Sequence, residues 1–222
     1  MYLVNNSLKT KSMYINGNYS ESFLDSYSLR NTLLGADILF RVTGLNQVSI
    51  IDSSGIEFCN IENNWKFRDY NSIIKIVEEF SGIDHNAVDA LISNIVYCSH
   101  NKISSIIWLP QDDSDQTLNA VLAKNYRALI LSLRCTRNSK ELSYKHLVKR
   151  IISSDGVTII NHLGRIKSHG AIVNLNKVVS KGQVGTGESA SKLLAQNGVA
   201  IKISQDGNIK VFYLGGERNL VF

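Results

Sequence analysis

Residues 182–189 are the part of this chain whose residue types best suit a phosphate. They read Gly-Gln-Val-Gly-Thr-Gly-Glu-Ser and lead into a segment with helical periodicity. A glycine-rich turn before a helix presents backbone N–H groups and the positive end of the helix dipole to an anion. Glu188 stands where a P-loop has its lysine, and a carboxylate there repels phosphate, so we reject a P-loop. The structural alternative is a helix N-terminus capped by Thr186 or Ser189.

Asp155 is the second candidate. It lies in the segment Ser153-Ser154-Asp155-Gly156, which ends a helical segment and begins an apolar one. A carboxylate at such a sheet edge can bind a divalent cation or orient a hydroxyl. The alternative is a turn that serves only the backbone. The 3 cysteines are far apart and the 5 histidines stand at no metal-ligand spacing. We therefore expect buried, inert thiols and neither a disulfide framework nor a structural zinc.

These residues need a scaffold, and the apolar pattern predicts one. Helices are predicted over residues 71–80, 84–97, 142–152 and 187–196, with a short helix near residues 27–34. Strands are predicted over residues 38–42, 47–51, 56–58, 103–109, 156–160, 171–175, 199–204 and 208–213, with hairpin turns at 52–55 and 205–207. In the helix over 142–152 we expect Leu147, Val148, Ile151 and Ile152 to face inward and the charge run 145–150 to be solvated. The fold class is α/β, a mixed central sheet flanked by helices and preceded by a small N-terminal α+β unit.

Length and composition set the organisation. We divide the 222 residues into an irregular N-terminal arm (1–35), a small unit of β-hairpin plus helix (36–82) and a main domain (83–222). No apolar run approaches the roughly 20 residues of a membrane helix. We expect a soluble, cytoplasmic protein without a membrane partner. The formal charge of +5 comes from scattered basic residues, so nucleic-acid binding is not indicated.

Taken in order, residues 83–213 resemble a diadenylate cyclase (DAC) domain, the module that joins two ATP molecules into cyclic di-AMP. Asp155-Gly156-Val157 is similar to the family's Asp-Gly-Ala motif. Gly185-Thr186 is similar to the Gly-Thr that precedes its Arg-His-Arg motif. The resemblance implies a DAC-like fold in which residues 171–175 recognise adenine through backbone groups.

The departures from the family are concentrated where the triphosphate binds. Gly187-Glu188-Ser189 replaces Arg-His-Arg, which removes every cation and adds an anion. Ser153-Ser154 stand where a histidine commonly precedes the Asp-Gly pair, and Gln205 replaces an acidic residue after the last-strand serine. Losing one preorganised donor typically costs roughly 100- to 1000-fold in rate, and two arginines more. Efficient cyclisation of ATP is therefore not expected.

The resemblance then implies a divergent, catalytically degenerate DAC-like domain that binds a cyclic dinucleotide or a mononucleotide messenger as a sensor. The residues implied to bind the nucleotide are Asp155, Gly156, Leu175, Gly185, Thr186, Gly187, Glu188 and Ser189. One alternative is an active nucleotidyl cyclase with Asp155 as catalytic residue and metal ligand, Mg²⁺ or Mn²⁺ as cofactor, and Lys181 or Lys192 in place of the arginines. Another is a scaffold with a vestigial site. An effector protein and a homodimer are possible partners besides the nucleotide.

Overall fold

The structure is a computed structural model of the chain. It describes residues 2–4, 10–13, 26–30, 33–42, 47–61, 63–123, 127–133, 141–175, 185–216 and 218–221. The chain divides into two compact units, with the boundary between Ile73 and Ile74. Unit 1 precedes this boundary, and unit 2 follows it through Val221. Each unit is described by itself below.

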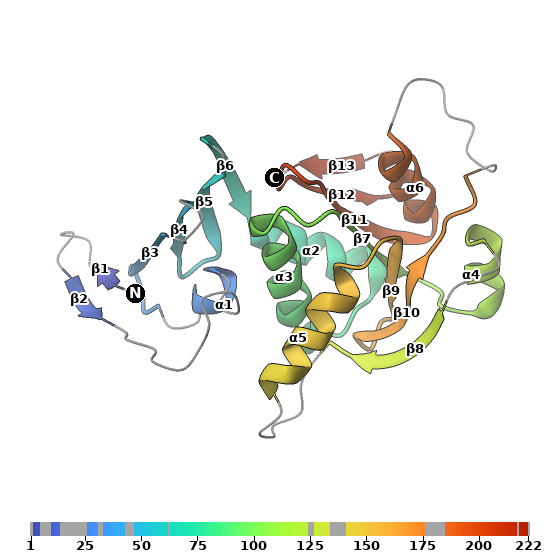
Figure 1. Cartoon of the computed structure of the whole chain (residues 1–222), viewed down its shortest axis with the longest axis horizontal. Coiled ribbons are helices and arrows are strands. Elements are labelled where there is room, and N and C mark those ends of the chain that lie inside the picture. The colour runs from blue at the N-terminus through green and yellow to red at the C-terminus, as the bar shows by residue number, and fades with distance from the viewer. Residues whose placement is uncertain are drawn as a thin grey trace. The chain divides into compact units, whose positions relative to one another are not determined.

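Unit 1 is built on a six-stranded antiparallel sheet in the order β2-β1-β3-β4-β5-β6 (Figure 1). The strands are β1 (Tyr2–Val4), β2 (Thr10–Met13), β3 (Ile38–Val42), β4 (Val48–Asp52), β5 (Ile56–Ile61) and β6 (Asn64–Asp69). The predicted hairpin turn at residues 52–55 is confirmed, and the carboxylate of Asp52 accepts a hydrogen bond from the Ile56 N–H. Helix α1 (Ser26–Arg30) packs on β3 and β4. The expected irregular arm therefore contains two strands that extend the sheet.

The inner face of this sheet, which α1 covers, carries a buried polar network. Glu57 and Arg68 are cross-strand partners with no exposed surface, and Arg68 Nη1 lies 3.3 Å from Glu57 Oε2. The hydroxyls of Tyr70 and Ser49 also donate to the Glu57 carboxylate. Burial raises the pKa of the Tyr70 hydroxyl well above its ordinary value, so it remains a donor. Three donors therefore partner the Glu57 carboxylate, whose charge would otherwise be costly to bury.

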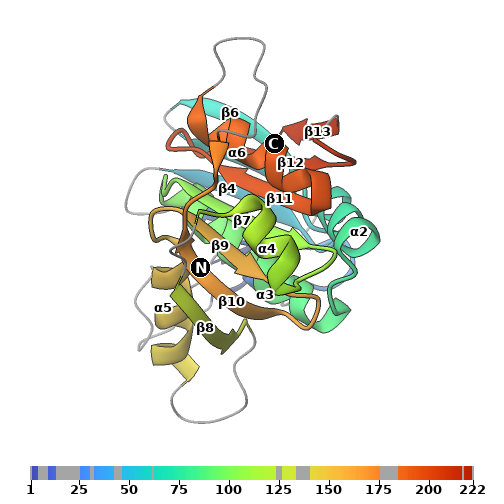
Figure 2. The same ribbon diagram turned by 90° about the vertical axis from the view of Figure 1, so that its right-hand side faces the viewer.

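Unit 2 is built on a seven-stranded sheet in the order β13-β12-β11-β7-β9-β10-β8, which Figure 2 shows. Its strands are β7 (Ser105–Pro110), β8 (Arg127–Ser132), β9 (Val157–Ile160), β10 (Arg165–Ala171), β11 (Gly198–Ile203), β12 (Ile209–Tyr213) and β13 (Arg218–Val221). Strands β7 and β9 are parallel, and the other neighbours are antiparallel. The sheet is mixed, as predicted.

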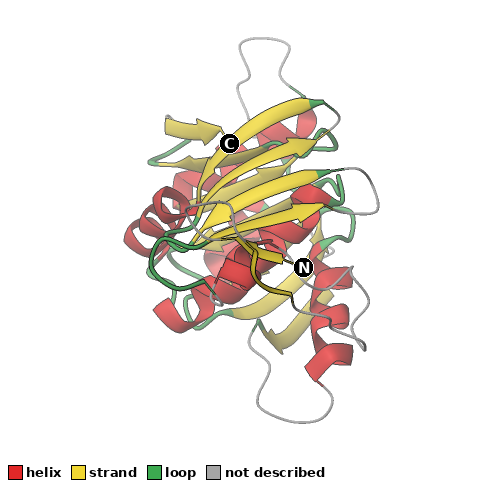
Figure 3. Ribbon diagram, turned by 90° about the vertical axis from the view of Figure 1, so that its left-hand side faces the viewer, coloured by secondary structure: helices red, strands yellow, loops and turns green. Residues whose placement is uncertain are grey.

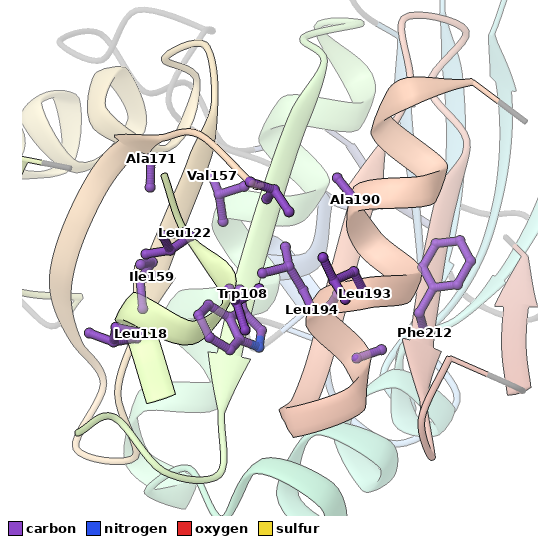
Figure 4. Close-up of a cluster of buried hydrophobic side chains, with 14 residues drawn as sticks. Trp108, Leu118, Leu122, Val157, Ile159, Ala171, Ala190, Leu193, Leu194 and Phe212 are labelled. Atoms are coloured by element: carbon purple, nitrogen blue, oxygen red, sulfur yellow. The ribbon is translucent and has the colours of Figure 1, made fainter. Parts of the chain in front are cut away.

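Helices cover both faces of this sheet (Figure 3). The helices are α2 (Tyr70–Ser81), α3 (His85–His100), α4 (Asp115–Val121), α5 (Glu141–Ile152) and α6 (Thr186–Leu194), followed by a 3-10 turn (Ala195–Asn197). On one face α3 packs against α5, and the Ser105 hydroxyl of β7 donates to the Ile152 carbonyl at the end of α5. On the other face α4 and α6 share a core with the sheet, in which Trp108 lies near the middle and Phe212 at one side (Figure 4).

The fold class is confirmed as α/β, with a mixed central sheet preceded by a smaller α+β unit. No helix in the described part of the chain is long and apolar enough to span a bilayer. Cys59 and Cys98 are free and buried, as expected, and burial raises the pKa of each thiol to about 12. Cys135 lies outside the described residues.

The strand predicted over residues 171–175 is wrong in position. The strand at this place is β10, which ends at Ala171, after a turn in which Asn161 Oδ1 accepts from the Leu163 and Arg165 N–H groups. The residues after Ala171 pair instead with the chain at the end of α4. The Ala123 N–H donates to the Ile172 carbonyl, and the Asn174 N–H donates to the Val121 carbonyl.

Two residues of α5 also differ from expectation. Leu147 was expected inside but is 47% exposed, and Lys149 was expected in the solvated charge run but is 6% exposed. The Lys149 ammonium lies 4.2 Å from the centroid of the Tyr97 ring on α3, a cation–π contact. Because a lysine can bury its long apolar stem, Lys149 packs between α5 and α3 at a position that charge alone would place outside.

The buried network of unit 1 generates the first prediction. Glu57→Ala leaves the Arg68 guanidinium buried without its carboxylate, so we expect a loss of about 3–5 kcal/mol in the free energy of unfolding. Urea unfolding followed by circular dichroism measures this loss. Glu79→Ala, at an exposed position of α2, is the matched control and should change stability by less than about 0.5 kcal/mol. An equal, small effect of both variants would contradict the role assigned to the network.

Candidate functional site

One row of residues crosses the centre of the unit 2 sheet and faces α6. Cross-strand pairing runs from Lys210 on β12 to Lys202 on β11, then to Ile106 on β7, Val157 on β9 and Ala171 on β10. Paired residues lie on the same face of a sheet. Val157 and Ala171 belong to the core shared with α6 and Ile106 packs against it, which places the whole row on that face. We call these five residues the site row.

The N-terminus of α6 lies against the lysine end of the site row. A Cβ atom placed on Gly187 would lie 3.2 Å from Lys202 Cε and 3.7 Å from Ile106 Cδ1, so glycine allows this close approach. Gly185 is the N-cap, and as a glycine it has no side chain with which to cap the helix. The first N–H groups of a helix have no partner within it. They and the helix dipole therefore provide a positive surface beside Lys202.

Glu188 does not present an unbalanced negative charge. Its Oε2 lies 2.9 Å from Lys210 Nζ, and its Oε1 lies 3.3 Å from Lys192 Nζ one helical turn away. The hydrogen bond from Lys210 holds the pKa of the Glu188 carboxyl below its ordinary value. The repulsion that the sequence predicts between Glu188 and phosphate is correspondingly reduced.

Lys202 lies directly opposite Lys210 on the neighbouring strand. Like charges at such a position destabilise a sheet. Glu188 offsets one of these charges through Lys210, while Lys202 faces Gly187 at the start of the helix. With Lys192, Lys202 and Lys210 against one glutamate, this end of the site row has an excess of positive charge.

Asp155 and Gly156 lie immediately before Val157 in the chain, and Gly156 lies against the backbone of Gly170 and Ala171 at the other end of the site row. Gly156 has a φ of 90°. A Cβ atom there would lie 2.7 Å from the carbonyl carbon of Gly170, so a side chain cannot be accommodated. Asp155 is exposed, and its Oδ1 accepts a hydrogen bond from the Gly156 N–H. This close approach fixes the start of β9 against β10 and sets the position of the Asp155 carboxylate.

Asp155 by itself is a weak metal site. Among the residues that the structure describes, it joins no set of three carboxylate, thiolate or imidazole groups close enough to share an ion. Magnesium commonly uses one or two protein carboxylates and completes its shell with water and substrate phosphates. Asp155 fits Mg²⁺ or Mn²⁺ only as such a single ligand, with phosphates supplying the rest.

The structure brings most of the predicted site residues to the site row. Gly187 contacts its lysine end and Glu188 bonds to it, while Gly185, Thr186 and Ser189 share the same helix start. Leu175 packs against the core that contains Val157 and Ala171. In Figure 4, Ala171, Val157 and Ala190 of α6 lie at one end of this core. The expected capping by Thr186 or Ser189 is wrong, because Gly185 is the N-cap. Lys181 and Gly182 lie outside the described residues.

Lys202 and Lys210 were not among the predicted site residues. The signal for them was present in the predicted hairpin around residues 205–207. In this hairpin Ile203 pairs with Ile209. The next pair away from the turn is then Lys202 opposite Lys210. The glycine-rich pattern of residues 182–189 indicates only the helix start, and it does not indicate which strands lie against that helix.

Comparison with known proteins does not identify the chain. No family model matches the sequence, and no curated protein matches it either. The site row and the start of α6 are therefore the basis for a functional hypothesis.

The Glu188 ion pairs generate the second prediction. A carboxyl whose pKa is lowered by folding contributes stability above its unfolded pKa and loses this contribution as pH falls through the folded pKa. We expect Glu188→Gln to lower the free energy of unfolding by up to about 1 kcal/mol at pH 7. The difference between the two proteins should shrink as the pH falls below the ordinary value of 4.5. Urea unfolding of both proteins between pH 3 and pH 7 measures it, and a difference that does not depend on pH would exclude the ionic origin.

Proposed function

We propose that this chain is a nucleotide-binding sensor with a catalytically degenerate DAC-like site. The observation that carries the proposal is the placement of Lys202 beside Gly187, at the N-terminus of α6, where the N-cap Gly185 has no side chain. Backbone N–H groups, a helix dipole and an ammonium group together form a phosphate-binding arrangement. The proposed ligand is a cyclic dinucleotide or a mononucleotide messenger.

The spacing along the site row supports a nucleotide rather than a bare phosphate. Lys202 and Val157 are separated by two strand spacings, or about 10 Å. A phosphate at the start of α6 would place its ribose and base toward the end of the apolar core where Val157 and Ala171 are buried and the half-buried Leu175 packs. Asp155 would then lie beside the sugar, where a carboxylate can accept a hydroxyl hydrogen bond.

The charge at the start of α6 favours ligands with few phosphate charges. Lys210 and Lys192 are already held by Glu188, so among the described residues Lys202 is the cation that remains beside the helix start. A triphosphate carries several charges and needs more cations than this to replace its hydration. Cyclic and monophosphate ligands match the site better.

The rival hypothesis is an active nucleotidyl cyclase. It requires Lys181 or Lys192 to replace the missing arginines. Lys181 lies outside the described residues, and Lys192 is engaged by Glu188 at 3.3 Å. Phosphoryl transfer depends on preorganised cations around the transferred group and on the bound metal. A single aspartate and a lysine shared with a glutamate are a poor substitute, so we favour the sensor.

Ligand binding provides the third prediction. A cyclic dinucleotide or nucleoside monophosphate should raise the melting temperature, because stabilisation follows RT ln(1 + [L]/Kd). In metal-free buffer these ligands should bind more tightly than triphosphates. Lys202→Gln removes a charge-assisted phosphate contact of about 1.5–3 kcal/mol, so Kd should rise about 10- to 100-fold. Thermal shift and isothermal titration calorimetry with a panel of linear and cyclic nucleotides measure both effects.

Lys75→Gln is the matched control for this experiment, because it removes the same charge from an exposed position on α2. It should leave Kd unchanged. If no nucleotide at millimolar concentration stabilises the wild-type protein, the vestigial scaffold is the better description. If both lysine variants weaken binding equally, the interaction is non-specific attraction to a basic protein.

Turnover provides the fourth prediction. Purified protein incubated with ATP or GTP and Mg²⁺ or Mn²⁺ should form no cyclic dinucleotide above background, because Gly187-Glu188-Ser189 replaces the Arg-His-Arg motif that the DAC resemblance implies for the triphosphate. Mass spectrometry of the reaction products measures this. A cyclic dinucleotide product that disappears in Asp155→Asn would overturn the proposal that the site is catalytically degenerate. It would favour the hypothesis of an active nucleotidyl cyclase.

A further inference from the structure

The outer face of the unit 1 sheet is more apolar than its inner face. Three rows of paired residues cross β3 to β6 on this outer face. The middle row is Phe40, Ile50, Phe58 and Phe67, one end row is Val42, Val48, Asn60 and Trp65, and the other is Ile38, Asp52, Ile56 and Asp69. By contrast, the inner face pairs Glu57 with Arg68 and Cys59 with Lys66. We call the three rows the aromatic face.

The aromatic face is open to solvent. Phe40, Phe58, Trp65 and Phe67 are 47%, 49%, 59% and 52% exposed, and Ile38 and Val42 are 42% and 58% exposed. The Phe58 and Phe67 rings contact each other edge to face with centroids 5.1 Å apart. Exposed apolar groups on this scale in one contiguous patch mark an interaction site.

The charges on this face indicate its partner. Its three rows contain no lysine or arginine, and their charged residues are Asp52 and Asp69 in one end row. Both carboxylates accept hydrogen bonds from nearby hydroxyls: Ser54 of the following turn donates to Asp52, and Ser72 in the first turn of α2 donates to Asp69. A single-stranded nucleic acid also stacks on aromatic sheet faces, but it requires cations along its backbone. The aromatic face supplies none, which favours a neutral, apolar partner.

We propose that the aromatic face binds a second copy of this chain, sheet against sheet. Aligned sheets pack about 10 Å apart through their side chains. A two-fold axis between the sheets and along the middle row would set Phe58 of one copy against Phe58 of the other. It would also set the aspartate row of each copy over the Trp65 row of its partner. The four carboxylates then do not meet, so the face is complementary to itself.

The available area suits a stable dimer. An aromatic side chain buries roughly 150–250 Å², so four half-exposed rings contribute about 400 Å² per copy. Ile38 and Val42, with the half-buried Val48, Ile50 and Ile56 between the rings, extend this toward the roughly 800 Å² that each partner buries in a standard interface. This inference is independent of the proposed nucleotide site, which lies in unit 2.

The mass of the full-length protein in solution provides the fifth prediction. Light scattering after size exclusion at micromolar concentration should give twice the chain mass of 24.7 kDa. Phe58→Lys should give the single-chain mass, because it places two ammonium groups opposite each other in the interface. Leu147→Lys, at an exposed position of unit 2, is the matched control and should remain dimeric.

Tryptophan fluorescence identifies the surface that is buried. The chain has 2 tryptophans, and Trp108 is fully buried within unit 2. Acrylamide should therefore quench Phe58→Lys more strongly than the wild type, because only its Trp65 becomes accessible. Circular dichroism checks that the variant folds, and Val42→Lys replaces it if it does not.

Two results would overturn the proposal. One is a wild-type protein of single-chain mass whose Trp65 is quenched by acrylamide. If that monomer binds single-stranded RNA or lipid vesicles, the aromatic face belongs to another partner. The other is a dimer whose mass and quenching do not change in Phe58→Lys and Val42→Lys, which would place the interface elsewhere.

Discussion

The parallel pairing of β7 with β9 imposes the main constraint on unit 2. Parallel strands need a crossover connection of a dozen or more residues. The chain between Pro110 and Val157 supplies it with α4, β8 and α5. Helix α5 packs on one side of β7, and α4 joins the core on the other side. Strand β7 is consequently buried on both faces, which explains its continuous apolar run from Ile106 to Leu109.

The position of α6 follows from the same arrangement. Because β7 lies between β11 and β9, Ile106 connects the lysines of β11 and β12 with the start of β9. Helix α6 crosses this row with glycine at the point of closest approach, where a larger residue would displace Lys202. The charge of Glu188 then has a structural purpose, since it allows Lys202 and Lys210 to stand opposite each other. A site that holds two lysines in this way has positive charge available beside a helix N-terminus.

Local pattern was sufficient to predict the elements whose periodicity is strong. Helices α2 and α3, strand β7 and the hairpin of β11 and β12 lie where the sequence places them. Strand β10 was misplaced because its residues Lys167, Ser168 and His169 are polar. Ser168 is nevertheless fully buried in the sheet. The site was only partly predictable for a related reason: the α6 segment is local, whereas the pairing of Lys202 with Ile106 joins residues nearly a hundred positions apart.

In unit 1 the hydrophobic pattern predicts strands β3, β4 and β5 but does not predict which face of the sheet is buried. A one-residue slip of register moves every side chain of a strand to the opposite face. Hydrophobic burial alone would favour such a slip here, because it would turn Phe58 and Phe67 inward and Glu57 and Arg68 outward. The observed register is held by the bonds among Glu57, Arg68 and Tyr70, which only the inner face provides. A buried charge pair contributes little to the net free energy of unfolding, but separating its two partners is strongly destabilising. The pair of Glu57 and Arg68 therefore specifies the strand register more than it stabilises the fold. The exposure of the aromatic face is thus a consequence of a polar network on the other side of the same strands.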